Sequence, residues 1–188
     1  MKKAILVLTI LFCCIFNVVA QEEIESEEYE VYKVWLNKIL IKPDTKQIVI
    51  MKFIADHRDD FTYLPRAKRR KLSQLQFSTL KNYRLRNRKT PELRNDFGVT
   101  PIINFITREE FLFFLGSYSA AEEFAKKFGA EYRISFSRVG FNKRKNQAML
   151  HVDFRSNLMR KYAYGYYFLY QKDGGNWILK QYVKSWEY

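Results

Sequence analysis

The chain has 188 residues, few glycines and prolines, and 47% hydrophobic residues, a composition that fits one compact domain rather than two. The formal net charge is +13. Both cysteines, Cys13 and Cys14, lie among the first 20 residues. A chain without this segment therefore has no disulfide, no zinc–thiolate site and no cysteine nucleophile.

Residues 1–20 have the layout of a secretory signal peptide. Two lysines precede an apolar run over residues 4–15, and residues 18–20 (Val-Val-Ala) end in small side chains at a suitable cleavage point. An uncleaved membrane anchor and a lipid attached to Cys14 are the alternatives. We expect export to the periplasm or the exterior and a single mature domain of residues 21–188.

The net charge is distributed unevenly. Residues 22–30 are rich in glutamate, whereas residues 66–89 are strongly basic, and loss of Lys2 and Lys3 would leave a net charge of +11. This surplus favours an anionic partner: a lipid headgroup, an acidic glycan or a protein of the cell envelope. Nucleic acid is a partner that an exported protein rarely meets. The alternative is that the charge only keeps the protein soluble.

The first half of the chain combines helix and strand signals. Apolar residues at helical spacing predict a helix from Ser26, its N-cap, to about Ile41. The short apolar run Gln47–Ala55 predicts a buried strand. Pro65 suits the first turn of a helix that the apolar stripe extends over Arg66–Asn87.

The third quarter has a predicted strand, Pro101–Ile106, followed by two capping boxes, Thr107–Glu110 and Ser119–Glu122. In this pattern a hydroxyl and a carboxylate each satisfy a free amide at a helix start. The predicted helices are Arg108–Leu115 and Ala120–Phe128, followed by Gly116 and Gly129, which suit left-handed caps.

The last third, from Glu131, predicts four strands joined by polar turns. Apolar and polar residues alternate over Gln147–Arg155, as in a half-buried strand. The apolar phase slips by one residue near Arg138, beside Gly140, which predicts a β-bulge or a sharp bend. We therefore predict an α+β fold with a mostly antiparallel sheet, whose C-terminal four-stranded meander packs against several helices.

Five aromatic residues lie in line on one face of the third of these strands: Tyr162, Tyr164, Tyr166, Phe168 and Tyr170. If exposed, they would be a stacking platform for sugar rings or bases. If buried, they are the core face against the helices. Five aromatic rings are more area than a monomer normally exposes, which favours the core.

Several short motifs occur in a characteristic order along the chain. They are residues 34–37 (Val-Trp-Leu-Asn), 105–110 (Phe-Ile-Thr-Arg-Glu-Glu), 137–142 (Ser-Arg-Val-Gly-Phe-Asn), 146–148 (Asn-Gln-Ala) and 175–177 (Gly-Asn-Trp). Together they resemble a group of small, uncharacterised exported bacterial proteins, whose most specific part is the Ser-Arg-Val-Gly-Phe-Asn block followed by Gln-Ala. The resemblance implies export and a shared fold and assigns no functional residue. The chain departs from the group at residues 156–160, where relatives often have glycines.

The catalytic candidate is a polar set on the outward face of one predicted strand, made of His151, Asp153 and Arg155. His151 and Asp153 are two residues apart, so they share one face at about 6 to 7 Å. Ser137 or Ser135 on a neighbouring strand would complete a nucleophile–base–orienter set. The chain has no Gly-x-Ser-x-Gly turn. A polar, solvent-facing strand surface is the alternative.

The binding candidate is the basic run at the start of the second helix: Arg66, Lys68, Arg69, Arg70 and Lys71. Five cations in six residues cannot all face a core, so most of them stand in water. Near an anionic surface each adds about 1 kcal/mol of attraction. A solvated helix face is the alternative.

Metal and cofactor signals are weak. The chain has two histidines, and the spacing of His57 and the aspartates within residues 56–60 does not place three ligands around one ion. There is no phosphate-binding loop and no dinucleotide fingerprint. We expect no cofactor and a non-enzymatic binding domain; the alternative is a hydrolase that uses His151 and Asp153.

Overall fold

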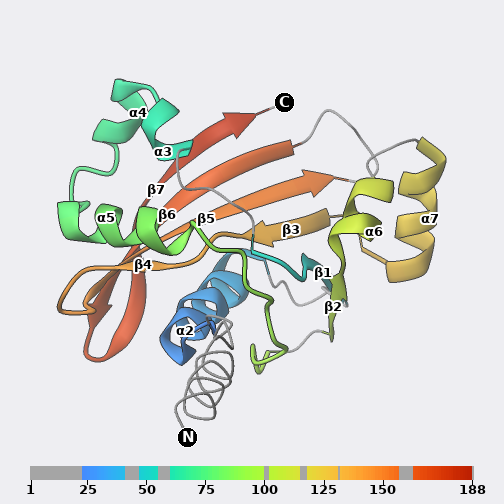
Figure 1. Ribbon diagram of the computed structural model, residues 1–188, viewed down its shortest axis with the longest axis horizontal. Helices are drawn as coiled ribbons and strands as arrows, with labels where there is room; N and C mark the ends of the chain where they lie inside the picture. The colour runs from blue at the N-terminus through green and yellow to red at the C-terminus, as the bar shows by residue number, and fades with distance from the viewer. Residues whose placement is uncertain are drawn as a thin grey trace, which may run out of the picture.

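The computed structural model describes residues 23–40, 47–54, 60–99, 102–114, 118–130, 132–156 and 163–187 (Figure 1). Its helices are α2 (Ser26–Trp35), the π-helical turn η1 (Leu36–Leu40), α3 (Asp60–Tyr63), α4 (Arg66–Arg70), α5 (Phe77–Arg86), α6 (Arg108–Phe113) and α7 (Tyr118–Phe128). Its strands are β1 (Gln47–Met51), β2 (Ile102–Ile106), β3 (Tyr132–Phe136), β4 (Gly140–Phe141), β5 (Gln147–Ser156), β6 (Ala163–Asp173) and β7 (Asn176–Glu187). Predictions about residues 1–20, His57, Gly116 and Tyr162 lie outside the described residues.

Within the described residues, seven strands form one mixed sheet in the order β2-β1-β3-β5-β6-β7, with β4 paired to β5. β1 lies parallel to both β2 and β3. Parallel pairing requires long crossover connections, and α3–α5 and α6–α7 lie in them. β3, β5, β6 and β7 are successive antiparallel neighbours. The α+β class is confirmed, and the parallel strands make the sheet mixed.

The bend predicted near Arg138 is confirmed. β3 ends at Phe136 and β4 begins at Gly140, and both pair with β5. Between them, the Ser137 hydroxyl accepts a hydrogen bond from the His151 N–H at 2.8 Å and donates one to the Arg138 carbonyl oxygen at 3.0 Å. A side chain therefore takes the place of a ladder hydrogen bond, which allows the strand to turn.

This bend holds a fully buried ion pair. Arg138 and Glu28 of α2 are both 0% exposed. Arg138 donates Nε and Nη2 to the Glu28 carboxylate at 2.7 to 3.1 Å, and the Val139 N–H donates to it at 2.9 Å. The Asn87 side chain accepts from the Arg138 N–H at 2.7 Å and donates to its carbonyl oxygen at 3.0 Å. The bend is thus tied to α2 and to the end of α5.

The prediction of one helix over Arg66–Asn87 is wrong, because α4 and α5 are separate helices. The cause is Gln147, at the start of β5. Its Oε1 accepts a hydrogen bond from the Gln76 N–H at 2.8 Å, and its Nε2 donates to the Gln74 carbonyl oxygen at 2.9 Å. These bonds satisfy backbone groups that a continuous helix would otherwise satisfy. The chain breaks there, and α4 lies beside β7 at the edge of the sheet (Figure 1).

The sheet is buried on both faces. On one face α2 packs against the largest core cluster, which includes Trp35, Leu150, Val152 and Phe154. On the other face α3 and α5 pack against a cluster that includes Met149, Tyr167 and Leu169, and α6 and α7 pack against a cluster around Val49 and Ile106. Met149 and His151 are each 0% exposed. The prediction that the face of β5 that carries Met149 and His151 points to solvent is therefore wrong.

The two clusters on that second face are separated by polar side chains. These are Arg133 and Ser135 of β3 and His151, Asp153 and Arg155 of β5, of which all but Arg155 are buried. A polar strip inside the protein has to be satisfied by its own members or by a ligand.

The local helix signals are confirmed in part. The Glu110 N–H donates to the Thr107 hydroxyl at 3.2 Å, and the Thr107 N–H donates to the Glu110 carboxylate at 3.0 Å, as the first capping box requires. α7 begins at Tyr118, so Ser119 lies within the helix and not before its first residue. Gly129 has a φ of 58°, which confirms the left-handed end of α7.

Candidate functional site

The basic run predicted as a binding surface forms α4 and the residue after it. No residue of α4 is buried, whereas Leu64 and Leu72, on either side, are each 3% exposed and anchor the segment. Lys68 Nζ donates to the Ser185 carbonyl oxygen of β7 at 3.3 Å. The remaining cations stand in solvent, and we call them the α4 basic surface: Arg66, Arg69, Arg70 and Lys71.

The glutamates near the start of the described chain neutralise other cations. Glu23, Glu25, Glu27 and Glu28 form ion pairs at 2.5 to 3.4 Å with Arg86, Arg94, Arg138, Lys145 and Lys172. In the part of the chain that the structure describes, no carboxylate lies within 4.0 Å of a charged group of the α4 basic surface. Within the described residues, the fold therefore separates a neutralised region from a surface whose positive charges have no carboxylate partner.

Two exposed aromatic side chains flank the α4 basic surface in sequence. Tyr63, at the end of α3, is 82% exposed, and Phe77, at the start of α5, is 77% exposed. Neither residue was predicted from the sequence, because no local pattern marks a single aromatic residue as exposed. Aromatic rings beside cations suit the interface between a bilayer and water, where rings lie at the level of the headgroups.

The predicted catalytic pair lies inside the protein. His151 packs its ring against the ring of Tyr167 with a centroid distance of 4.4 Å. Its Nε2 lies 2.8 Å from Ser185 Oγ, and its Nδ1 lies 3.8 Å from Asp153 Oδ1. The serine that contacts the imidazole is therefore Ser185 of β7, whereas Ser137 bonds to backbone. No sequence signal pointed to Ser185, which is 34 residues from His151 and reaches it only through strand pairing.

Close packing gives this polar cluster a structural role. A Cβ on Gly165 of β6 would lie 2.6 Å from Asp153 Oδ1, 2.6 Å from Ser185 Oγ and 2.4 Å from Trp186 Nε1. Side-chain atoms of β5 and β7 thus occupy the space that a side chain at residue 165 would need. The 3.8 Å separation of His151 and Asp153 also exceeds hydrogen-bond length. The cluster joins β5, β6 and β7 through side chains.

The aromatic ladder of β6 lies mainly in the core. Phe168 and Tyr170 are buried, and Tyr164 and Tyr166 are half-buried. Trp35 of α2 packs edge-on against Phe168 at 6.1 Å. Burial also raises the pKa of the Tyr170 hydroxyl. These contacts favour the core interpretation over an exposed stacking platform.

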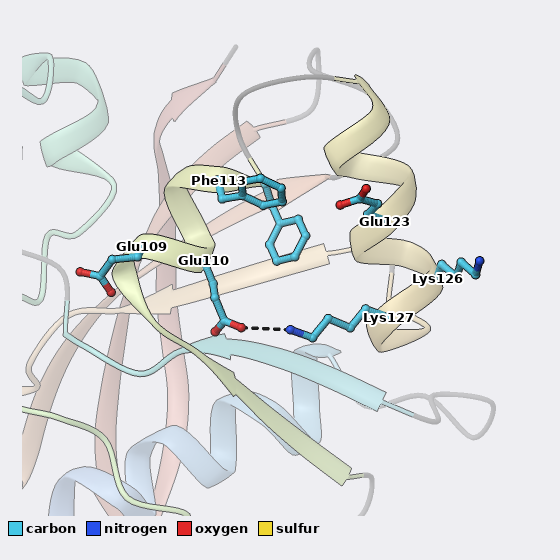
Figure 2. Close-up of a pocket in the computed structure, with 7 residues that line it drawn as sticks. Glu109, Glu110, Phe113, Glu123, Lys126 and Lys127 are labelled. Atoms are coloured by element: carbon cyan, nitrogen blue, oxygen red, sulfur yellow. Dashed lines mark hydrogen bonds and ion pairs between the residues drawn. The ribbon is translucent and has the colours of Figure 1, made fainter.

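A groove of about 790 Å³ lies between α6 and α7 (Figure 2). Figure 2 shows Phe113 between the two helices and the Glu110–Lys127 ion pair, 3.0 Å long, that joins them. The lining residues are Glu109, Glu110, Phe113, Phe114, Glu123, Lys126 and Lys127. Because the rim carries charges of both signs, the groove favours no single class of ligand.

Among the described residues, no group of three or more histidine, cysteine, aspartate and glutamate side chains is placed to hold a metal ion. The helices in this part of the chain include none that is long and apolar enough to cross a bilayer. Comparison with protein-family models, with curated proteins and with solved structures finds no match to this chain. The resemblance to a group of exported bacterial proteins stays a prediction, and function is argued from the side chains described above.

Proposed function

We propose that this protein is an exported, non-enzymatic domain that binds the surface of an anionic phospholipid bilayer in the cell envelope through the α4 basic surface. The observation that carries the proposal is the separation of charge. The glutamates near the start of the described chain pair with cations elsewhere, and the α4 basic surface is left without carboxylate partners in the described residues. Export rests on the signal-peptide layout of residues 1–20.

Electrostatics and burial together support a lipid surface over a soluble anion. The four cations occupy little more than one helical turn, so their fields add within a Debye length of about 8 Å at physiological salt. Each contributes about 1 kcal/mol near an anionic membrane. Tyr63 and Phe77 add apolar contacts that an acidic glycan would use less well.

The test is sedimentation with vesicles of phosphatidylcholine that contain or lack phosphatidylglycerol, at low and physiological salt. The wild type is expected to bind only the anionic vesicles, and added salt should weaken binding. Reversal of Arg69, Arg70 and Lys71 to glutamate should weaken it about a hundredfold or more, because three attractive terms become repulsive.

The matched control reverses three exposed cations that lie on other elements: Lys38, Arg108 and Lys126. This control changes the net charge by the same amount as the reversal of Arg69, Arg70 and Lys71. Comparison of vesicle binding by the two variants therefore separates the role of the α4 basic surface from that of total charge. Equal losses of vesicle binding in the two variants would show that binding depends on total charge and not on the α4 basic surface. Binding to a soluble acidic polysaccharide but not to vesicles would overturn the lipid proposal.

Export is tested by the intact mass of protein recovered from outside the cytoplasm. The expected species begins near Gln21 and carries no acyl group. A mass that retains residues 1–20, or that includes a lipid on Cys14, would contradict this part of the proposal.

The alternative function is a hydrolase, and one observation favours it: Ser185, His151 and Asp153 occur in the order of a nucleophile, a base and its orienter. A fluorophosphonate probe would label Ser185 if the serine is activated. Labelling that disappears in both Ser185→Ala and His151→Ala would support the hydrolase, and an unlabelled folded wild type would exclude this site.

A further inference from the structure

Arg133 of β3 and Arg155 of β5 lie directly opposite each other in the antiparallel register. Residues in this relation project from the same face of a sheet with Cβ atoms about 4.5 to 5.5 Å apart. The Phe111 ring of α6 faces both guanidinium groups, whose Cζ atoms lie 5.2 Å and 5.8 Å from its centroid. Phe124 and Trp186 lie beside Arg133 and Arg155, at 5.5 Å and 5.6 Å. Aromatic rings thus hold two like charges side by side.

The Arg133 charge has no counter-charge in the described part of the chain. Arg133 is 3% exposed, its Nη1 donates to the Phe111 carbonyl oxygen at 3.2 Å, and its buried Nε has no hydrogen-bond partner. No carboxylate of the described residues lies within 4.0 Å of either guanidinium. The nearby Asp153 directs its Oδ1 over Gly165, toward β6.

The environment of Arg133 disfavours its charged form. Burial, and then the positive charge of Arg155, lowers the pKa of Arg133 to about 10. The aromatic rings attract the guanidinium groups but carry no net charge to neutralise them. Arg155 is half-buried and still reaches solvent, so an anion can approach the pair from its side.

We propose that Arg133 and Arg155 form a binding site for a phosphate group, carried by a small molecule or by a lipid headgroup. A phosphate monoester carries close to two negative charges at neutral pH and three acceptor oxygens, so one group neutralises both guanidiniums. Arginine forks match phosphate oxygens, and the surrounding rings strengthen these bonds by excluding water. The site lies on β3 and β5, apart from the α4 basic surface, and it does not depend on the proposed function.

The test measures binding to the mature protein by calorimetry and thermal unfolding, at constant ionic strength. The probes are inorganic phosphate, glycerol phosphate, acetate and chloride. Both phosphates should raise the unfolding temperature saturably, acetate less, and chloride not at all. Equal affinities would identify phosphate itself as the ligand, and tighter binding of glycerol phosphate would identify a headgroup. Binding of glycerol phosphate should weaken several-fold below the second pKa of a phosphate monoester, about 6, where the group loses charge.

Arg155→Gln should weaken phosphate binding about tenfold or more, because it removes charged hydrogen bonds from an exposed side of the site. Arg133→Met should abolish the saturable response while the protein remains folded. The control is Arg69→Gln, which removes one cation from the α4 basic surface and should leave the affinity unchanged. The proposal is overturned if phosphate stabilises the wild type no more than chloride does, or if Arg155→Gln binds phosphate as tightly as the wild type.

Discussion

Two buried arginines, Arg138 and Arg133, lie in opposite electrostatic environments in this fold. Arg138, at the bend after β3, has the Glu28 carboxylate at 2.7 Å. Arg133, at the start of β3, has two phenylalanine rings and a second arginine. Burial of an unpaired ion costs several kcal/mol, whereas a cation–π contact returns about 0.5 to 2 kcal/mol. The charge of Arg138 is therefore neutralised within the fold, whereas the cost of burying Arg133 is offset only in part by the described residues and would be offset further by the proposed phosphate.

The largest expected effect comes from breaking the ion pair between Arg138 and Glu28. Glu28→Gln keeps the shape of the side chain but leaves Arg138 buried beside a neutral amide, and we expect a loss of about 3 to 5 kcal/mol in the free energy of unfolding. Urea denaturation measures it. The control is Glu30→Gln, since Glu30 is exposed and pairs only with Lys33 at the surface in the described structure. Equal losses for the two variants would show that the buried pair has no special role.

A second prediction concerns the enclosure of Arg138. A Cβ on Gly140 would lie 2.4 Å from Cα of Tyr83, so Gly140→Ala must push α5 away from the bend. We expect a loss of about 1 to 3 kcal/mol. In Gly165→Ala the new methyl group meets ends of side chains, which can move, and the loss should be smaller. The same denaturation experiment compares the two variants, and the reverse order would contradict the close approach of α5.

The third prediction concerns α6, which places Phe111 over Arg133. The Thr107 N–H, followed by Lys127, lowers the pKa of Glu110. The folded state therefore favours the ionised carboxylate, so this stabilisation is present above the ordinary pKa near 4.5 and is lost as the pH falls through the lowered value. Glu110→Gln should lower the free energy of unfolding by about 0.3 to 1 kcal/mol at neutral pH. The free energy of unfolding of this variant should also fall less steeply as the pH is lowered. An unchanged pH profile of unfolding would contradict it.

The smallest expected effect is at Arg133. Arg133→Met replaces a buried charge that has no counter-ion among the described residues by an apolar side chain of similar length, so the free energy of unfolding in chloride should change by less than about 1 kcal/mol or should rise. A loss as large as that of Glu28→Gln would mean that Arg133 is neutralised within the protein, and the contrast between the two arginines would disappear.

Local patterns predicted what depends on local interactions. The alternation of Gln147–Arg155 indicated a strand, the phase slip indicated the bend at Arg138, and the first capping box placed the start of α6. The break between α4 and α5 could not be predicted, because its cause, Gln147, lies 71 residues from Gln76.

The candidate sites were predictable to different degrees. The run of cations at α4 is visible in the sequence, whereas its lack of carboxylate partners in the described residues depends on where Glu25 and Glu28 lie in the fold. The pairing of Arg133 with Arg155 depends on the register of β3 and β5, and the contact of Ser185 with His151 depends on that of β5, β6 and β7. Sequence patterns predict that strands exist but do not fix such registers across long separations.

The central place of β3 and β5 in the sheet has a consequence for how the chain acquires its structure during synthesis. Trp35 of α2 packs on Phe136, Phe154 and Phe168. β1 pairs with β2 and β3, across separations that make such contacts slow to form. The side chain of Trp35 therefore lacks the aromatic residues that cover it until β3, β5 and β6 have been synthesised. We therefore expect the core around Trp35 to form late in synthesis, after β6 has left the ribosome.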